Sequence, residues 1–62
     1  MPYVNIRVAG SLTREQKAEM SREVTASISR IANKPPEAIL IMIDEIASEN
    51  VAKAGLLVDS PK

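Results

Sequence analysis

The sequence predicts an α+β fold in which two parallel strands are joined by one helix and followed by a short C-terminal hairpin. Three segments support this prediction: residues 3–9 alternate between apolar and polar, residues 14–32 are amphipathic, and residues 38–43 are continuously apolar. Two strands joined by a helix of this length form a right-handed crossover with the helix on one face. We therefore expect residues 1–62 to form a single β-α-β domain.

The first strand is predicted at residues 3–9. Val4, Ile6 and Val8 share one face and polar side chains occupy the other, which is the period of a half-buried strand. Gly10 follows the alternating segment and ends the pattern.

The helix is predicted from Arg14 to Ala32. Thr13 and Gln16 have the spacing of a capping box, in which the Thr13 hydroxyl accepts the unpaired amide of Gln16. Asn33 suits the position after the helix, and the prolines that follow cannot continue it. The apolar residues of the segment form one stripe, made of Met20, Val24, Ile28 and Ile31.

The second strand is predicted at residues 38–43, ahead of Asp44 and Glu45. A continuous apolar run rich in β-branched residues is typical of a strand covered on both faces. The single helix covers one face only, so we expect a second subunit to cover the other. Residues 46–60 carry small and apolar side chains around Gly55, which favours a short hairpin or an arm over a neighbouring subunit.

The composition excludes several classes of function. The 62 residues contain no His and no Cys, so thiol catalysis, disulfides and an ordinary zinc site are excluded, and we expect a metal-free function. Eight basic residues balance eight acidic ones, which argues against a nucleic-acid partner. No segment predicts a membrane span or a signal peptide, so we expect a cytoplasmic protein. A chain this small buries only about 60% of its surface, which favours a homo-oligomer.

Pro2 is the candidate catalytic residue. If Met1 is removed, Pro2 carries a secondary amine, and burial or a nearby cation would lower the pKa of that amine and make it a general base. The alternative is structural, because proline is tolerated at the first residue of a strand. Asp44 and Glu45 are adjacent and point to opposite faces, so we interpret them as a solvated strand end with a partner charge nearby.

The order of these features resembles the 4-oxalocrotonate tautomerase family over nearly the whole chain. The matching segments are Met1-Pro2, Thr13-Arg14-Glu15-Gln16-Lys17, Pro35-Pro36-Glu37, Ile43-Asp44-Glu45, Glu49-Asn50-Val51 and Gly55. The resemblance implies the tautomerase (MIF-like) fold, whose β-α-β subunits pair into four-stranded dimers and assemble as trimers of dimers. It also implies cofactor-independent keto-enol tautomerisation of a small unsaturated 2-oxo or 2-hydroxy acid, with Pro2 as general base.

The substrate-binding positions of the family are altered in this chain. By the resemblance, Leu12 and Leu40 stand where the best-known members have arginines, and Val51 stands where they have an aromatic residue. The candidate substrate-binding residues are Arg7, Leu40 and Val51, with Arg7 as the best substitute cation. Arg7 has a structural alternative, which is to pair with a carboxylate across the sheet. Ala54 replaces the first glycine of the hairpin, where a positive φ would strain it.

Two functions from different classes therefore remain open. One is a tautomerase with Pro2 as general base. The other is a non-catalytic or assembly subunit of a heterohexamer, in which a partner chain contributes the arginines. A weaker third hypothesis is a hydratase, dehalogenase or decarboxylase with a cationic Pro2, for which the sequence offers no water-activating acid.

Overall fold

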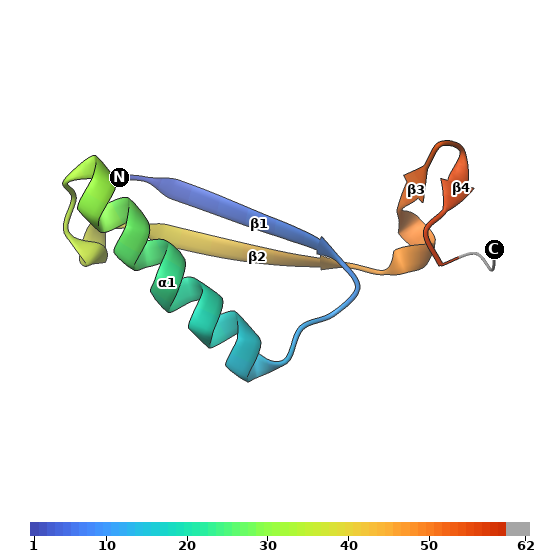
Figure 1. Cartoon of the computed structure of the whole chain (residues 1–62), viewed down its shortest axis with the longest axis horizontal. Helices are drawn as coiled ribbons and strands as arrows, with labels where there is room; N and C mark the ends of the chain where they lie inside the picture. Colours follow the sequence, from blue (N-terminus) through green and yellow to red (C-terminus); the bar gives the residue numbers. More distant parts are fainter. Residues whose placement is uncertain (60–62) are drawn as a thin grey trace.

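The computed structural model describes residues 1–59 and has the predicted β-α-β architecture (Figure 1). Strand β1 spans Tyr3–Ala9, helix α1 spans Arg14–Ala32 and strand β2 spans Leu40–Ile46. Strands β1 and β2 are parallel, with Tyr3 opposite Leu40 and Ala9 opposite Ile46. Short 3-10 helices precede and follow β2, and a small hairpin completes the described chain: η1 Pro36–Ala38, η2 Ser48–Asn50, β3 Ala52–Lys53 and β4 Leu56–Leu57.

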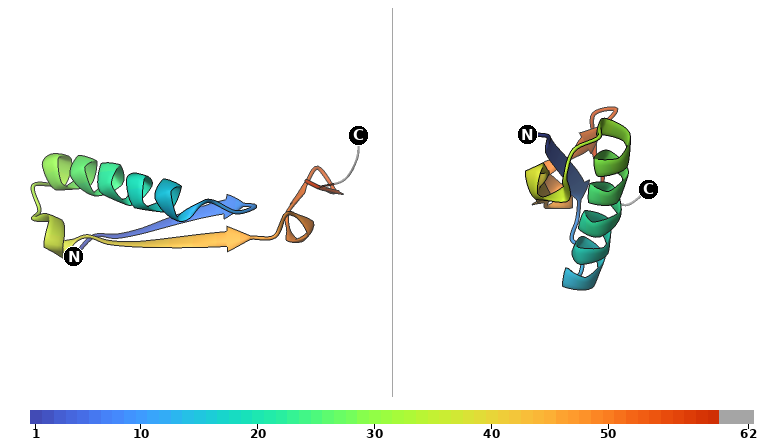
Figure 2. Two further views of the ribbon diagram at one scale, coloured as in Figure 1. Left: turned by 90° about the horizontal axis from the view of Figure 1, so that it is seen from below. Right: turned by 90° about the vertical axis from the view of Figure 1, so that its left-hand side faces the viewer.

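Helix α1 begins and ends where the sequence predicts. The Gln16 amide donates to the Thr13 hydroxyl at 3.1 Å, and the Thr13 amide donates to the Gln16 side-chain oxygen at 2.9 Å, so both halves of the capping box form. Asn33 ends the helix in the left-handed conformation, at φ 56, and its amide donates to the carbonyl of Ser29. Figure 2 shows α1 lying along one face of the two-stranded sheet.

The predicted bounds of the second strand, residues 38–43, are wrong at both ends. The Pro36–Ala38 segment is a 3-10 turn, in which the Ala38 amide donates to the Pro35 carbonyl at 3.0 Å, so β2 begins only at Leu40. The strand continues to Ile46 because its last three residues stay paired with residues 7–9 of β1, and Asp44 and Glu45 each meet a cation, one on either face of the sheet. Paired charges do not end a strand.

The two faces of the sheet are covered unequally. The face toward α1 carries half-buried Val4, Ile6 and Ile43, whereas Leu40 and Met42 on the opposite face are 48% and 41% exposed. No residue within the described part of the chain is fully buried. The accessible surface is 5001 Å², which is about 1,100 Å² more than a compact protein of this mass exposes. The single chain thus leaves one face of β2 uncovered, as the sequence predicts.

The hairpin of β3 and β4 extends beyond the end of the sheet (Figure 1). Ala52 is opposite Leu57 in an antiparallel pair, and the turn residues Ala54 and Gly55 have φ values of 54 and 82. A two-residue turn with positive φ at both positions matches the twist of a hairpin, but it strains a residue that has a Cβ atom. The predicted hairpin and its strained Ala54 are confirmed. None of the helices in residues 1–59 is long and apolar enough to span a membrane.

Candidate active site

Pro2 lies immediately before β1 and is held by its carbonyl group. The Leu40 amide donates to the Pro2 carbonyl oxygen at 3.0 Å, which joins Pro2 to the first residue of β2. Met1 is 77% exposed and precedes the strand, which begins at Tyr3. Removal of Met1 would therefore convert the Pro2 nitrogen into an amine without breaking a bond of the β1–β2 ladder.

Leu40 lies at the same end of the sheet as Pro2, with its side chain on the open face. Arg7 and Val51 lie at the other end, where both line a cavity of about 440 Å³ together with Ile46 and Asn50. The cavity is bounded by the carboxyl ends of β1 and β2 and by the segment that leads into the hairpin.

One chain does not bring all four predicted residues together. Pro2 and Arg7 are five residue steps apart in the sequence, which is about 17 Å at ~3.3 Å per residue. A small acid cannot contact both at once. The structure thus places Pro2 with Leu40 and, separately, Arg7 with Val51.

Arg7 also forms the cross-strand pair expected as its structural alternative. Its guanidinium lies 3.5 Å from the Asp44 carboxylate, and the two side chains are 70% and 43% exposed. A single long contact between exposed groups contributes little to stability. Arg7 can therefore be redirected at small energetic cost.

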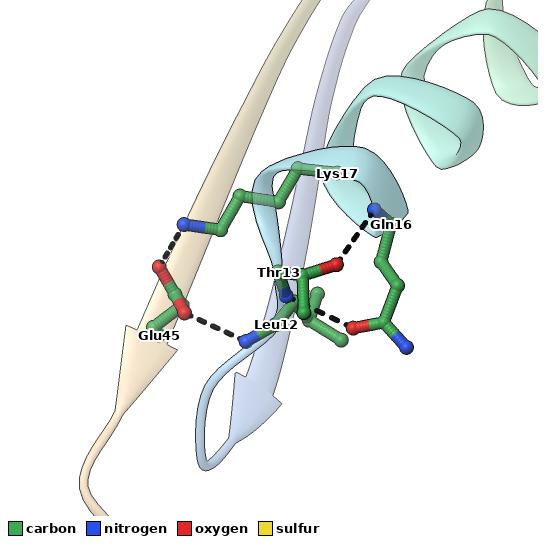
Figure 3. Close-up of polar contacts among 5 residues, drawn as sticks. All are labelled: Leu12, Thr13, Gln16, Lys17 and Glu45. Atoms are coloured by element: carbon green, nitrogen blue, oxygen red, sulfur yellow. Dashed lines mark hydrogen bonds and ion pairs between the residues drawn. The ribbon is translucent and has the colours of Figure 1, made fainter.

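Glu45 forms a second polar cluster, which sequence reasoning did not identify (Figure 3). Its carboxylate forms an ion pair with Lys17 of α1 and accepts the Leu12 amide at 2.8 Å. The hydrogen bond from Lys17, followed by the one from the Leu12 amide, lowers the pKa of Glu45 below its ordinary value. The cluster fastens the loop before α1 to the end of β2. The alternation of side chains along β2 could have indicated this contact, because Glu45 lies two residues after Ile43 and therefore on the same helix-facing side.

Leu12 is fixed by this cluster through its backbone. Its side chain lines a groove of about 470 Å³ along one flank of α1, next to Met20 and Val24. Leu12 thus adds apolar surface to this groove and no charge. No group of three or more potential metal-ligating side chains occurs among residues 1–59.

A parallel β-α-β unit followed by a C-terminal antiparallel hairpin is the fold of tautomerase-like subunits. The family model described as "Tautomerase enzyme" matches residues 2–60. The chain belongs to this family, and its solved structural neighbours include 4-oxalocrotonate tautomerase homologues.

Individual relatives agree with this assignment. A "Probable tautomerase" of Bacillus cereus is 34% identical over 55 residues, which cover 89% of this chain and 90% of the relative. The crystal structure of DmpI from Helicobacter pylori matches with 30% identity and a TM-score of 0.83, over 92% of this chain and 90% of the other. A heterohexamer 4-oxalocrotonate tautomerase from Chloroflexus aurantiacus shares the fold, with a TM-score of 0.92 over the whole of both chains at 21% identity.

Proposed function

We propose that the protein is a cofactor-independent tautomerase that interconverts the enol and keto forms of a small unsaturated 2-oxo or 2-hydroxy acid. The carrying observation is the anchoring of Pro2: its carbonyl is bonded to Leu40 at 3.0 Å, and its nitrogen lies outside the β1–β2 ladder behind an exposed Met1. Membership of the tautomerase family supports the same reaction class.

In this proposal the Pro2 amine acts as general base and then as general acid. Its lone pair takes the proton of the enol hydroxyl on C2, and the C2–O bond becomes a carbonyl. The electrons of the C2–C3 double bond move to C3, which receives the proton back from the protonated amine. Atoms and charge balance over the cycle, and the amine ends neutral and ready for another turnover.

We further propose that the working form is a homo-oligomer, a dimer or a trimer of dimers. The extra exposed surface of about 1,100 Å² per chain matches or exceeds the ~800 Å² that each partner buries in a standard interface. The apolar open face of the sheet, with Tyr3, Leu40 and Met42 exposed, supports this assembly.

The intact mass of the purified protein is the first test. Loss of one methionine residue is expected, because only then is the Pro2 nitrogen an amine. A chain that retains Met1 contradicts Pro2 as the base in that sample.

The Pro2→Ala variant then tests the base directly. Removing the positioned base should reduce kcat/KM on phenylenolpyruvate by about 10²- to 10⁴-fold. Pro35→Ala is the matched control, since Pro35 is exposed and lies in the loop before η1. Unchanged turnover of Pro2→Ala would contradict the proposed function.

A second candidate function is that of a non-catalytic or assembly subunit in a mixed hexamer. It is favoured by Leu12 and Leu40, which occupy the positions where the resemblance implies arginines, and by the fold shared with a heterohexamer tautomerase. Co-purification of a second, arginine-bearing family member in one stable complex, with no activity of the chain alone, would support it.

A further inference from the structure

Arg7 and Asp44 are the charged residues on the open face of the two-stranded sheet. They are opposite one another in the β1–β2 register, with the cation on β1 and the carboxylate on β2. Arg7 is exposed between half-buried Ile6 and Val8, so it faces away from α1. Pro2 has the parity of the helix-facing side. The surroundings of Arg7 on the open face are therefore separate from those of Pro2.

The contact between Arg7 and Asp44 leaves most of their hydrogen-bonding capacity unused. One guanidinium nitrogen, Nη2, lies 3.5 Å from one carboxylate oxygen, Oδ2, and the side chains are 70% and 43% exposed. A guanidinium has several further N–H donors, and a carboxylate has further acceptor positions. Arg7 also lines the cavity of about 440 Å³, which leaves room beside it for another carboxylate. Each group can therefore bind a second group of opposite charge.

The open face has an apolar end and a charged end. Tyr3 and Leu40 are opposite one another at the start of the strands, where they are 69% and 48% exposed. Arg7 and Asp44 are opposite one another further along the same strands. A second face that met this one with its strands reversed would place charges against apolar side chains, which costs free energy of desolvation. Two such faces therefore match when their strands run in the same direction.

The two strands also carry opposite charges, which selects the strand that can lie over β1. If β1 of a second copy lay over β1 of the first, two Arg7 cations would meet and repel each other. If β2 of the second copy lies over β1, its Asp44 meets Arg7 and its Leu40 meets Tyr3. A symmetric pair of copies, or a closed ring of them, repeats this contact in every copy. The pattern is self-complementary, so the partner that fits it is a second copy of the chain.

The two ends of the open face contribute differently to such a contact. The surplus exposed surface of about 1,100 Å² per chain supplies the area that a standard interface needs, and the apolar end supplies burial. Arg7 and Asp44 are each more than two-fifths exposed and so belong to the margin of the contact. Charges at the rim of an interface add little affinity, but they exclude partners that would oppose like charges.

We propose that Arg7 and Asp44 exchange partners between copies and thereby restrict assembly on the open face to chains that carry the same pair. This inference rests on the proposed homo-oligomer and names the groups that select its subunits. A related chain with the reversed pair would oppose like charges at this face, which is how interfaces reject wrong partners. The chain should therefore associate with itself in preference to other subunits of the same fold.

A charge-swapped double variant tests this selection. Arg7→Glu/Asp44→Arg keeps the net charge and the ion pair within the chain, so it should fold and assemble to the wild-type mass. Every exchanged contact with the wild type would join like charges. When the two chains are co-expressed with different tags, complexes that carry both tags should be at least about tenfold rarer than for two wild-type chains. Glu15→Arg/Arg22→Glu, a swap at two exposed positions of α1, is the control expected to mix freely with the wild type.

The single variants distinguish contacts between copies from the contact within a chain. Arg7→Glu makes the charged end acidic and Asp44→Arg makes it basic, so each alone should need at least about tenfold more protein to assemble. Asp44→Asn opposes no charges and should change that concentration by less than about threefold. An equal mixture of the acidic and basic variants, or their co-expression if either fails to fold alone, should recover the wild-type mass, because each supplies the charge that the other lacks.

The outcomes of these experiments are distinct. Free mixing of the wild-type and charge-swapped chains overturns the exchange, and so does a mixture of the single variants that stays unassembled. A second polypeptide bound to the purified wild-type chain overturns a second copy as the occupant of the open face. A wild-type protein that keeps the monomer mass at every concentration overturns the proposed homo-oligomer itself.

Discussion

Neighbouring residues of β2 have different surroundings because they lie on opposite faces of the sheet. Ile43 and Glu45 are on the side covered by α1, where Glu45 meets both Lys17 and the Leu12 amide. Met42 and Asp44 are on the open side, where Met42 is 41% exposed and Asp44 has one contact of 3.5 Å with a mostly exposed arginine. The chain completes the first face itself and leaves the second incomplete.

The difference between the two faces indicates that assembly contributes to the stability of the fold. A strand places alternate side chains on opposite faces, so a continuously apolar strand under one helix must expose every second apolar residue. A chain of this size has little stability to spare. The open face is therefore the region where a second molecule should contribute most.

The largest expected effect comes from a charge on the open face. Met42→Asp should dissociate the proposed oligomer, because an uncompensated charge buried in an interface costs about 3–5 kcal/mol. Light scattering after size exclusion should show the monomer mass, with loss of helical circular dichroism. Ser27→Asp, at an exposed position of α1, should change neither. A Met42→Asp protein of unchanged assembled mass would contradict an interface on this face.

A substitution that creates a cavity on the helix-facing side should lower the stability of the fold without changing its assembly. Ile43 is half-buried there, so Ile43→Ala should lower the free energy of unfolding by about 1–3 kcal/mol, somewhat below the cost at a fully buried site. Urea denaturation measures the loss, and the assembled mass should stay the same. Ile43→Val serves as the conservative control and should cost about 1 kcal/mol or less. Dissociation caused by Ile43→Ala would remove the distinction between the two faces.

Glu45 should give a smaller and pH-dependent effect. Its pKa is lowered in the folded chain by Lys17 and then by the Leu12 amide. The stability it contributes is therefore fully present above the ordinary Glu pKa and is lost as the pH falls through the lowered value. Glu45→Gln should lower the urea midpoint at pH 7, and the gap to the wild-type protein should close at acid pH. A gap that persists with the carboxylate protonated would argue against the ion pair as its cause.

The smallest effect is expected one residue earlier in β2. Asp44→Asn removes the partner of Arg7 on the open face, but both side chains are more than two-fifths exposed. The change in unfolding free energy should be about 0.5 kcal/mol or less. The same urea titration compares it with Glu45→Gln. A loss equal to that of Glu45→Gln would mean that the two faces hold their carboxylates equally firmly.

Local patterns account for the elements that sequence reasoning predicted well. The bounds of β1 and α1 follow from side-chain periodicity and from the capping residues Thr13 and Asn33, all of which act within a few positions. The bounds of β2 were missed because Pro36 opens a 3-10 turn and because the charges after Ile43 find partners far along the chain. The Lys17–Glu45 pair was missed for the same reason.

The sequence by itself determined the β-α-β order, the face of each strand that α1 covers and the choice of Pro2 and Arg7 as candidates, because these depend on spacing along the chain. Only the tertiary structure decided that Pro2 and Arg7 lie at opposite ends of β1 and that Arg7 shares a cavity with Val51. Those two relations depend on the pairing register of β1 with β2 and on the position of the segment between β2 and the hairpin. Both are set by contacts between segments that are distant in the sequence.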